Sequence, residues 1–176
     1  FPNDFRAYNN LGEMAFAAGD MAKAESYFKQ AAAKNANAPE VNANLGLCEL
    51  VKNNVASAES YLGKATGANA ANEALGNLYI KQGQYQRAVT AFGDAKTNSA
   101  AQAQILAKDY NKAKATLQAI KDKDAMTDYL MAIVGARTNN ESLVKSSIKS
   151  AIAKDASLAT KAANDREFAK FASALK

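Results

Sequence analysis

The chain has 176 residues, 48% of them hydrophobic and 22% charged, and it carries a formal net charge of +5 with only two prolines. This composition suits packed helices and argues against a disordered chain. Its single cysteine cannot form an intramolecular disulfide, the lack of histidine removes the commonest metal ligand and general base, and no apolar run approaches the roughly 18 residues that span a membrane.

The first predicted helical pair covers residues 5–34. Asp4 is suited to cap a helix over residues 5–18, and Gly19-Asp20 forms the turn because glycine tolerates a positive φ. The second helix is predicted over residues 21–34. Its apolar face has members at i, i+4 and i+7, which are Ala24, Phe28 and Ala31.

The second pair repeats the first after 34 residues. Leu45-Gly46 follows Leu11-Gly12 at this spacing, and Ala58, Leu62 and Ala65 follow the apolar face of the first pair. Pro39 is expected in the first turn of its first helix, where a missing N–H costs nothing. Asn53-Asn54 replaces the glycine turn, because asparagine adopts the left-handed conformation more readily than most residues.

The third pair comes early, since Ala88 follows Ala58 by 30 residues. The preceding helix is therefore expected to lose about one turn. Three aromatic residues are predicted to fill the core between helices: Tyr79, Tyr85 and Phe92.

Two further pairs and a tail follow. A short helix over residues 99–108 precedes one over residues 111–119, with an apolar spacing of Tyr110, Ala113, Leu117 and Ile120. The fifth pair is predicted over residues 125–137 and 141–154. Placing Val144, Ile148 and Ala151 on its second-helix face puts Ala132 at the glycine position and Gly135 at an aromatic position, so a slip of one residue is the alternative. In the tail, Asp165 is expected to cap a final helix whose apolar residues are Phe168, Phe171 and Leu175.

The order Leu75-Gly76, Tyr79, Gly83, Ala88, Phe92, Ala95 resembles the tetratricopeptide repeat, a helix-turn-helix unit. This resemblance implies an all-α fold, an α-solenoid of about five helical hairpins with a C-terminal capping helix. The whole of residues 1–176 is expected to form one such solenoid, with regular repeats over residues 5–97, compressed repeats over residues 98–155 and the cap over residues 156–176.

The resemblance also implies a concave binding groove lined by the first helix of each pair. The positions carried over are Arg6, Asn9, Glu13 and Phe16, then Ala43, Leu47, Leu50 and Val51, then Glu73, Asn77, Ile80 and Lys81. Apolar groove residues indicate a site for a protein or peptide partner. The alternative is that other parts of the same protein cover them.

One tetratricopeptide subfamily grips the terminal carboxylate of chaperone tails with Lys, Asn and Arg. Asn9 fits this pattern, but Glu13, Ala43 and Glu73 supply no cation. We therefore expect no binding of chaperone tails.

The positive charge lies in the second part of the chain. Six Lys and Arg face seven Asp and Glu through Ala68, whereas sixteen face ten beyond it. Acidic neighbours alternate with the lysines, as in Lys121-Asp122-Lys123-Asp124, and no aromatics are interleaved. A solvated basic face is favoured, and RNA binding, weakened by salt, is the alternative.

No catalytic residue, metal ligand or cofactor is predicted, so we expect a non-enzymatic protein. Cys48 is expected to be a buried packing residue rather than a reactive thiol. Ser146, Ser147 and Ser150 beside Lys145 and Lys149 are interpreted as a solvated helix face rather than a nucleophile with its base.

The sequence therefore predicts a scaffold for protein–protein interaction. The segments Phe1–Gly12 and Asp165–Phe168 resemble those of tetratricopeptide proteins of the Gram-negative envelope, which favours the periplasm or outer membrane as the location. Because the chain begins without Met, it is interpreted as a fragment of a larger bacterial protein. Self-association by stacking of the first repeat is a further alternative.

Overall fold

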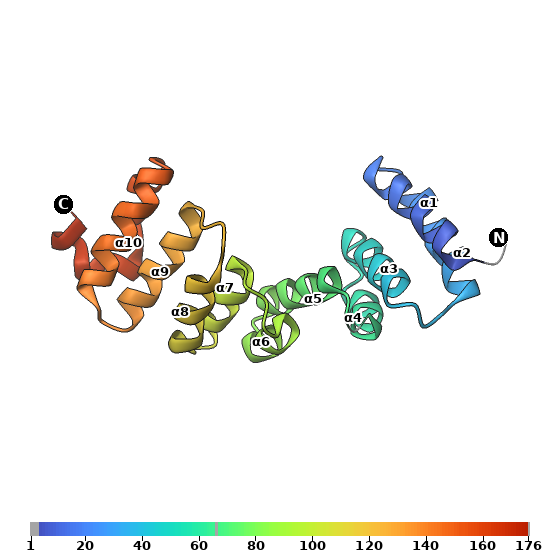
Figure 1. Cartoon of the computed structure of the whole chain (residues 1–176), viewed down its shortest axis with the longest axis horizontal. Coiled ribbons are helices and arrows are strands. Elements are labelled where there is room, and N and C mark those ends of the chain that lie inside the picture. Colours follow the sequence, from blue (N-terminus) through green and yellow to red (C-terminus); the bar gives the residue numbers. More distant parts are fainter. Residues whose placement is uncertain (1–3, 66, 176) are drawn as a thin grey trace. The chain divides into compact units, whose positions relative to one another are not determined.

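The computed structural model describes residues 4–65 and 67–175, apart from the side chains of residues 173–175, so that predicted Leu175 lies outside the described side chains. Every regular element in these ranges is a helix, as predicted (Figure 1). In chain order the helices are α1 (Phe5–Ala17), α2 (Met21–Lys34), α3 (Pro39–Val51), α4 (Val55–Lys64), α5 (Asn69–Lys81), α6 (Tyr85–Phe92), α7 (Asn98–Leu106), α8 (Tyr110–Ala119), α9 (Ala125–Arg137), α10 (Glu141–Lys154), α11 (Leu158–Asn164) and η1 (Arg166–Leu175).

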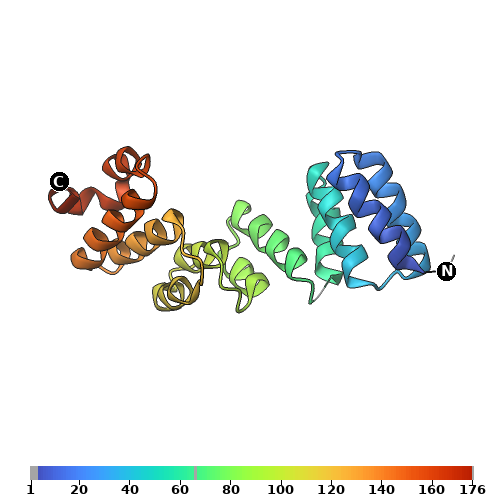
Figure 2. The ribbon, with the colours of Figure 1, turned by 45° about the horizontal axis from the view of Figure 1, so that its top comes forward.

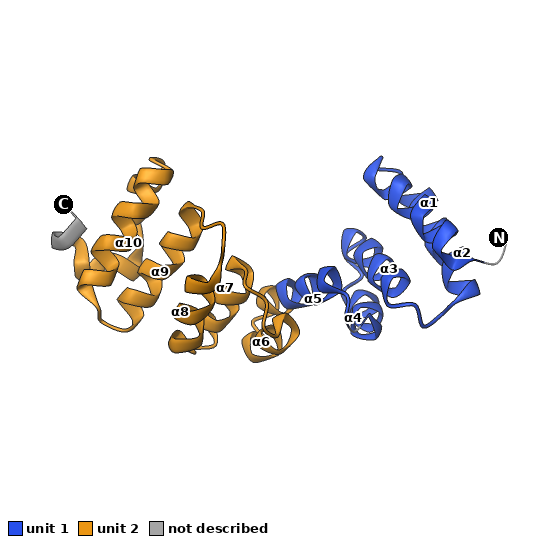
Figure 3. Cartoon of the chain, viewed as in Figure 1, with its two compact units in different colours: residues 1–78 blue, residues 79–176 orange. Residues whose placement is uncertain are grey.

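The helices fall into two compact units, residues 1–78 and residues 79–176 (Figure 3). In the first unit, α1 pairs with α2 and α3 pairs with α4, while α2 also contacts α3. Figure 2 shows these four helices side by side in blue to cyan. In the second unit, α7 pairs with α8, α9 pairs with α10, and η1 packs on α9, α10 and α11. Both units are therefore built from helical hairpins, the architecture of an α-solenoid.

Side-chain caps fix where several helices begin. The Asp4 carboxylate accepts a hydrogen bond from the Arg6 backbone N–H at 3.0 Å, which confirms the predicted N-cap of α1. Asp20 accepts from the Lys23 N–H at 3.1 Å in the same way at the start of α2. Helix α3 starts at Pro39, as predicted.

Among the described residues, the turns that follow α1, α3, α5, α7 and α9 share one geometry. The residue two positions after the first helix has a positive φ in each, and these residues are Gly19, Asn53, Gly83, Lys108 and Asn139. The N–H of the following residue donates to the carbonyl five residues earlier at 2.8–2.9 Å: Asp20 to Ala15, Asn54 to Glu49, Gln84 to Tyr79, Asp109 to Gln104 and Asn140 to Gly135. This is the Schellman arrangement of helix C-termini.

The common turn decides the register of the fifth hairpin. Val144 follows Asn140 by four residues, as Ala24 follows Asp20 in the first hairpin, and both are fully buried. Gly135 therefore occupies the position of Ala15 without a slip of one residue. A β-carbon on Gly135 would lie 3.0 Å from the Val144 nitrogen, so a small residue suits this position.

Helix lengths depart from uniformity in two places. Helix α4 has 10 residues where α2 has 14, which confirms the predicted loss of a turn. Helix α6 has only 8 residues because Gly93 ends it with φ +56°. Ala95, the last residue of the repeat pattern that begins at Leu75, lies beyond the end of this helix.

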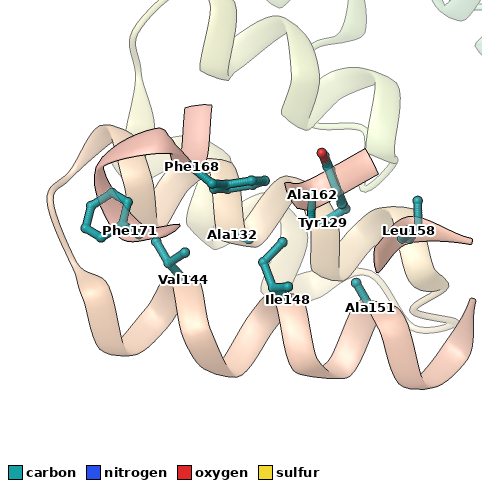
Figure 4. Packing of buried hydrophobic residues seen from close by; sticks show 9 residues of the cluster. All are labelled: Tyr129, Ala132, Val144, Ile148, Ala151, Leu158, Ala162, Phe168 and Phe171. Atoms are coloured by element: carbon teal, nitrogen blue, oxygen red, sulfur yellow. The ribbon is translucent and has the colours of Figure 1, made fainter. Parts of the chain in front are cut away.

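The C-terminal segment forms the predicted cap on the fifth hairpin, although η1 is a 3₁₀-helix. Phe168 is 1% exposed and packs edge to face on Tyr129, with ring centroids 5.5 Å apart. Figure 4 shows Phe168 and Phe171 of η1 facing the same buried cluster as Ile148 of α10. The cap thus covers apolar side chains of α9 and α10.

Candidate functional site

The predicted groove residues of α1 and α3 lie in the first unit. Arg6 is exposed, and its guanidinium bonds Asp4 through Nε to Oδ1 at 2.9 Å and Nη2 to Oδ2 at 2.9 Å. This pairing lowers the pKa of the Asp4 carboxyl and raises that of Arg6. The charge of Arg6 is therefore balanced by its neighbour.

A polar network joins α1 to α3. The Asn9 amide Nδ2 donates to Glu13 Oε1 at 2.8 Å. Asn44 Nδ2 donates to Asn9 Oδ1 at 2.9 Å and to the same Glu13 oxygen at 3.1 Å. Asn9 is only 4% exposed, whereas Glu13 is exposed. The two amides thus hold the Glu13 carboxylate in place at the surface.

Sequence reasoning missed Asn44, which follows Asn9 by 35 residues rather than by the repeat period of 34. Its neighbour Ala43 was predicted in the groove but is buried, in the cluster that contains Leu62 and Ala65. Asn44 could have been found as the polar residue directly after Ala43, because this step along the helix brings it to the face of α3 that contacts α1.

The apolar groove residues of α3 divide between two faces. Val51 is 59% exposed and Leu47 is half-buried, and both share a helix face with Asn44 because they follow it by seven and three residues. Leu50 instead packs against the buried cluster that contains Ala43. We call the surface formed by these residues the α1–α3 surface: Asn9, Glu13, Asn44, Leu47 and Val51.

The remaining predicted residues contribute unevenly. Phe16 is half-buried and packs against the core between the first two hairpins. On α5, Glu73 and Lys81 are exposed, while Asn77 and Ile80 are half-buried. The boundary between the two units falls within α5, so Ile80 and Lys81 belong to the second unit.

Two open depressions lie outside the α1–α3 surface. One, of about 230 Å³, lies on the first hairpin beside Leu11 and Met14, which are 43% and 69% exposed. The other, of about 390 Å³, lies in the second unit between the turn at Gly83 and the turn at Lys108. Arg87 at its edge lies 4.1 Å from the Tyr79 ring centroid and donates to the Tyr79 hydroxyl at 2.6 Å.

An ionic network links α2 to the C-terminal end of α3. Lys52 pairs with Glu25 at 3.1 Å and with Glu49, and Lys29 pairs with Glu25 at 2.7 Å. Hydrogen bonds to these ammonium groups lower the pKa of both glutamates. Lys29 and Lys52 are therefore both paired with glutamates of the same unit.

The residues considered for chemistry are buried, hydrogen-bonded or exposed in different parts of the fold. Cys48 is 3% exposed, and burial raises the pKa of its thiol, as expected of a packing residue. The solvated-face interpretation fails for two serines: Ser147 is 8% exposed, and the Ser150 hydroxyl donates to Asp128 at 2.6 Å. Lys145, Ser146 and Lys149 are exposed as predicted.

Within residues 4–65 and 67–175, no three Cys, Asp or Glu side chains gather as a metal site would require. None of the helices described is both long enough and apolar enough to cross a lipid bilayer.

Family models identify the repeat. Two models described as tetratricopeptide repeats match residues 15–78 and residues 71–99. With the shared turn and hairpin geometry, these matches show that the chain is a tetratricopeptide-repeat protein, as the sequence resemblance implies.

Solved structures of low sequence identity share the fold. A tetratricopeptide repeat protein from Parabacteroides merdae aligns with a TM-score of 0.75 and 17% identity, over 98% of this chain and 76% of that one. PilW, a widely conserved type IV pilus biogenesis factor, aligns with a TM-score of 0.61 and 20% identity, over 99% of this chain and 84% of that one. A thermophilic tetratricopeptide protein of Thermus thermophilus gives 0.53 and 16%, over 97% and 98%. No curated protein sequence matches the chain.

Proposed function

We propose that the protein is a non-enzymatic scaffold that binds a peptide or protein segment on the α1–α3 surface. One observation carries this proposal: a polar network between α1 and α3 lies beside apolar side chains of α3 that are not fully buried. Val51 is 59% exposed beside half-buried Leu47, and the network of Asn9, Glu13 and Asn44 lies on the same face. Exposed apolar side chains bordered by fixed polar groups are typical of partner sites.

Binding to chaperone tails is not part of the proposal. The amide of Asn9, the one residue that fits a carboxylate clamp, already donates to Glu13 at 2.8 Å. A terminal carboxylate would meet the negative charge of Glu13 rather than a cation, which disfavours its binding.

The proposal is tested by affinity capture from an extract of the native organism with Leu47→Glu combined with Val51→Glu. We expect partners captured by the parent protein to be lost, because two carboxylates would be desolvated in the contact. A matched control places two glutamates at Ala56 and Ser60, which are exposed on α4. Leu50 is left unchanged because it packs in the core. Retention of the same partners by the double variant would refute the α1–α3 surface as the binding site.

Within this function, the cell envelope is the proposed location. The structural similarity to PilW, a type IV pilus biogenesis factor, supports it, together with the envelope-like segments Phe1–Gly12 and Asp165–Phe168. Fractionation of cells that produce the native protein should place it in the periplasmic or outer-membrane fraction. Recovery in the cytosol alone would exclude this location.

Self-association is a second candidate function, favoured by exposed Leu11 and Met14. Leu11 is 43% exposed, whereas its repeat equivalent Leu45 is 4% exposed because the first hairpin covers it. A second copy could cover Leu11 and Met14 in the same manner. Light scattering over a concentration series should then show a dimer that Met14→Glu dissociates, and a monomer at high concentration would exclude it.

A further inference from the structure

We propose that the α1–α3 surface selects partner segments that carry a lysine or arginine next to apolar residues. This inference rests on the proposed function and adds the chemistry of the partner. This preference for a basic partner is opposite to that of a cationic clamp, which would bind a terminal carboxylate.

The Glu13 carboxylate is arranged to receive a cation. Its Oε1 accepts two amide hydrogen bonds, from Asn9 at 2.8 Å and from Asn44 at 3.1 Å. Neutral amides orient the carboxylate without cancelling its charge, and no ion pair within the described residues includes Glu13. A partner ammonium or guanidinium would meet an acceptor that is already oriented, which lowers the entropic cost of the contact.

The cations carried by α1 and at the end of α3 are already paired with carboxylates. Arg6 precedes Asn9 and Glu13 by three and seven residues and lies close enough to Glu40 to interact with it, but its charge is balanced by Asp4. Lys52 pairs with Glu25 of α2 and with Glu49. Glu40 is exposed four residues before Asn44 and therefore on the same face of α3. The charge that these two helices expose on this face is thus negative, which complements a basic partner.

The apolar part of the partner follows from the order of side chains along α3. Leu47 and Val51 lie about one and two turns beyond Asn44, and both have surface to bury. A segment whose cation reaches Glu13 would place neighbouring apolar side chains over these two residues. Burial of the apolar part supplies affinity, and the ion pair fixes which segments bind.

The probe for this inference is a random 12-residue peptide library displayed on phage. It is selected in parallel on the parent protein, on Glu13→Gln and on Leu47→Glu, with Asp122→Asn as a control that removes one exposed carboxylate from a loop of the second unit. Circular dichroism and thermal melting verify that each variant is folded.

We expect the parent and Asp122→Asn to enrich peptides that combine Lys or Arg with Leu, Ile or Phe. On Glu13→Gln the basic bias should disappear while the apolar bias remains. A synthetic copy of an enriched peptide should bind Glu13→Gln about tenfold more weakly, and its affinity for the parent should fall with added salt.

The outcomes separate the two proposals. Peptides enriched without basic residues, or equally on Glu13→Gln, yet lost on Leu47→Glu, would overturn the partner chemistry and leave the binding surface standing. Absence of enrichment on the parent, or enrichment that Leu47→Glu does not change, would overturn both.

Discussion

Gly46 shows how closely the two helices of a hairpin approach. A β-carbon at this position would lie 2.6 Å from Leu62 Cγ and 3.2 Å from the Leu62 backbone nitrogen. Leu62 is 2% exposed, so its side chain has little room to move. The repeat therefore requires glycine here for close packing rather than for backbone freedom, since Gly46 lies within α3.

Gly46→Ala is expected to lower the free energy of unfolding by about 1–2 kcal/mol, because overpacking outweighs the better helix propensity of alanine. The matched control is Gly63→Ala in α4, where nothing lies within 4 Å of the added β-carbon. This control should raise stability by about 0.5–1 kcal/mol. Urea denaturation measures both, and equal effects of the two substitutions would contradict the packing argument.

At the level of single residues, the sequence predicted core positions better than surface ones. Phe28 and Leu62 are buried as the repeat period predicts, because the apolar face of each second helix packs against the first helix of its own hairpin. Asn44 escaped prediction because its role depends on two partners on another helix. Ser147 and Ser150 were misjudged because the predicted pairing of α9 with α10 does not show which polar side chains of α10 are buried or bonded to α9.

Among the elements, η1 is attached to α9 by polar as well as apolar contacts. The Tyr129 hydroxyl donates to Asp165 Oδ2 at 2.6 Å, and Asp165 Oδ1 accepts from the Glu167 N–H at 2.9 Å. Arg137 Nε donates to Glu167 Oε2 at 2.7 Å. One tyrosine and one arginine of α9 thus hold the segment that enters η1.

The Tyr129 contact predicts a dependence on alkaline pH. Burial, and then the Asp165 carboxylate, raise the pKa of the Tyr129 phenol above its ordinary range. Its stabilising contribution is therefore complete below pH of about 10, and is lost as the pH rises further, because the unfolded chain then releases a proton that the folded chain retains.

Tyr129→Phe should cost about 1 kcal/mol at pH 7 through the lost hydrogen bond. This cost should shrink by up to ~1.4 kcal/mol per pH unit above about pH 10, and could reverse in sign. Urea midpoints at pH 7, 9 and 11 provide the test, with Tyr8→Phe in α1 as the control for one fewer phenol. A difference that is constant with pH would rule out the linkage.

The helices themselves were predicted closely, with ends that match within two residues for α1, α2, α9 and α10. The early end of α6 was not apparent from the repeat pattern, which continues to Ala95. It depends on the left-handed conformation that Gly93 adopts, and a glycine permits that conformation without requiring it. The register of the fifth hairpin stayed open for a related reason. Ala132 stands where the repeat usually has glycine, and Gly135 stands where it usually has an aromatic residue. The hydrogen bond from the Asn140 N–H to the Gly135 carbonyl was needed to align the fifth hairpin with the first.

On the scale of the whole molecule, the net charge of +5 overstates the positive charge that is available. In the second unit many basic side chains already contact acceptors or rings. Lys154 lies 2.8 Å from Asp128, Arg137 pairs with Glu167, Lys161 lies over the Tyr129 ring at 4.8 Å, and Lys170 donates to Asn139 at 2.6 Å. Dispersed, paired lysines form a poor track for phosphates.

We therefore expect single-stranded RNA to bind weakly. Fluorescence anisotropy with a labelled 20-nucleotide poly-uridine should show a Kd above roughly 10 μM at about 150 mM salt. Tighter binding with a steep salt dependence would instead restore the RNA hypothesis. The measurement needs no mutation, so it depends on no assumption about folding of a variant.

The shared turn has a consequence for how such a chain can change. Each of these turns has an equivalent backbone hydrogen bond next to a residue of positive φ. Because the bond joins backbone groups, the turn imposes no particular sequence on the two helices that it connects. Lys108 and Gly83 stand at equivalent joints despite their chemical difference. Whole hairpins could therefore be transplanted or duplicated as interchangeable modules, each bringing its own surface, while the geometry of the junction is preserved.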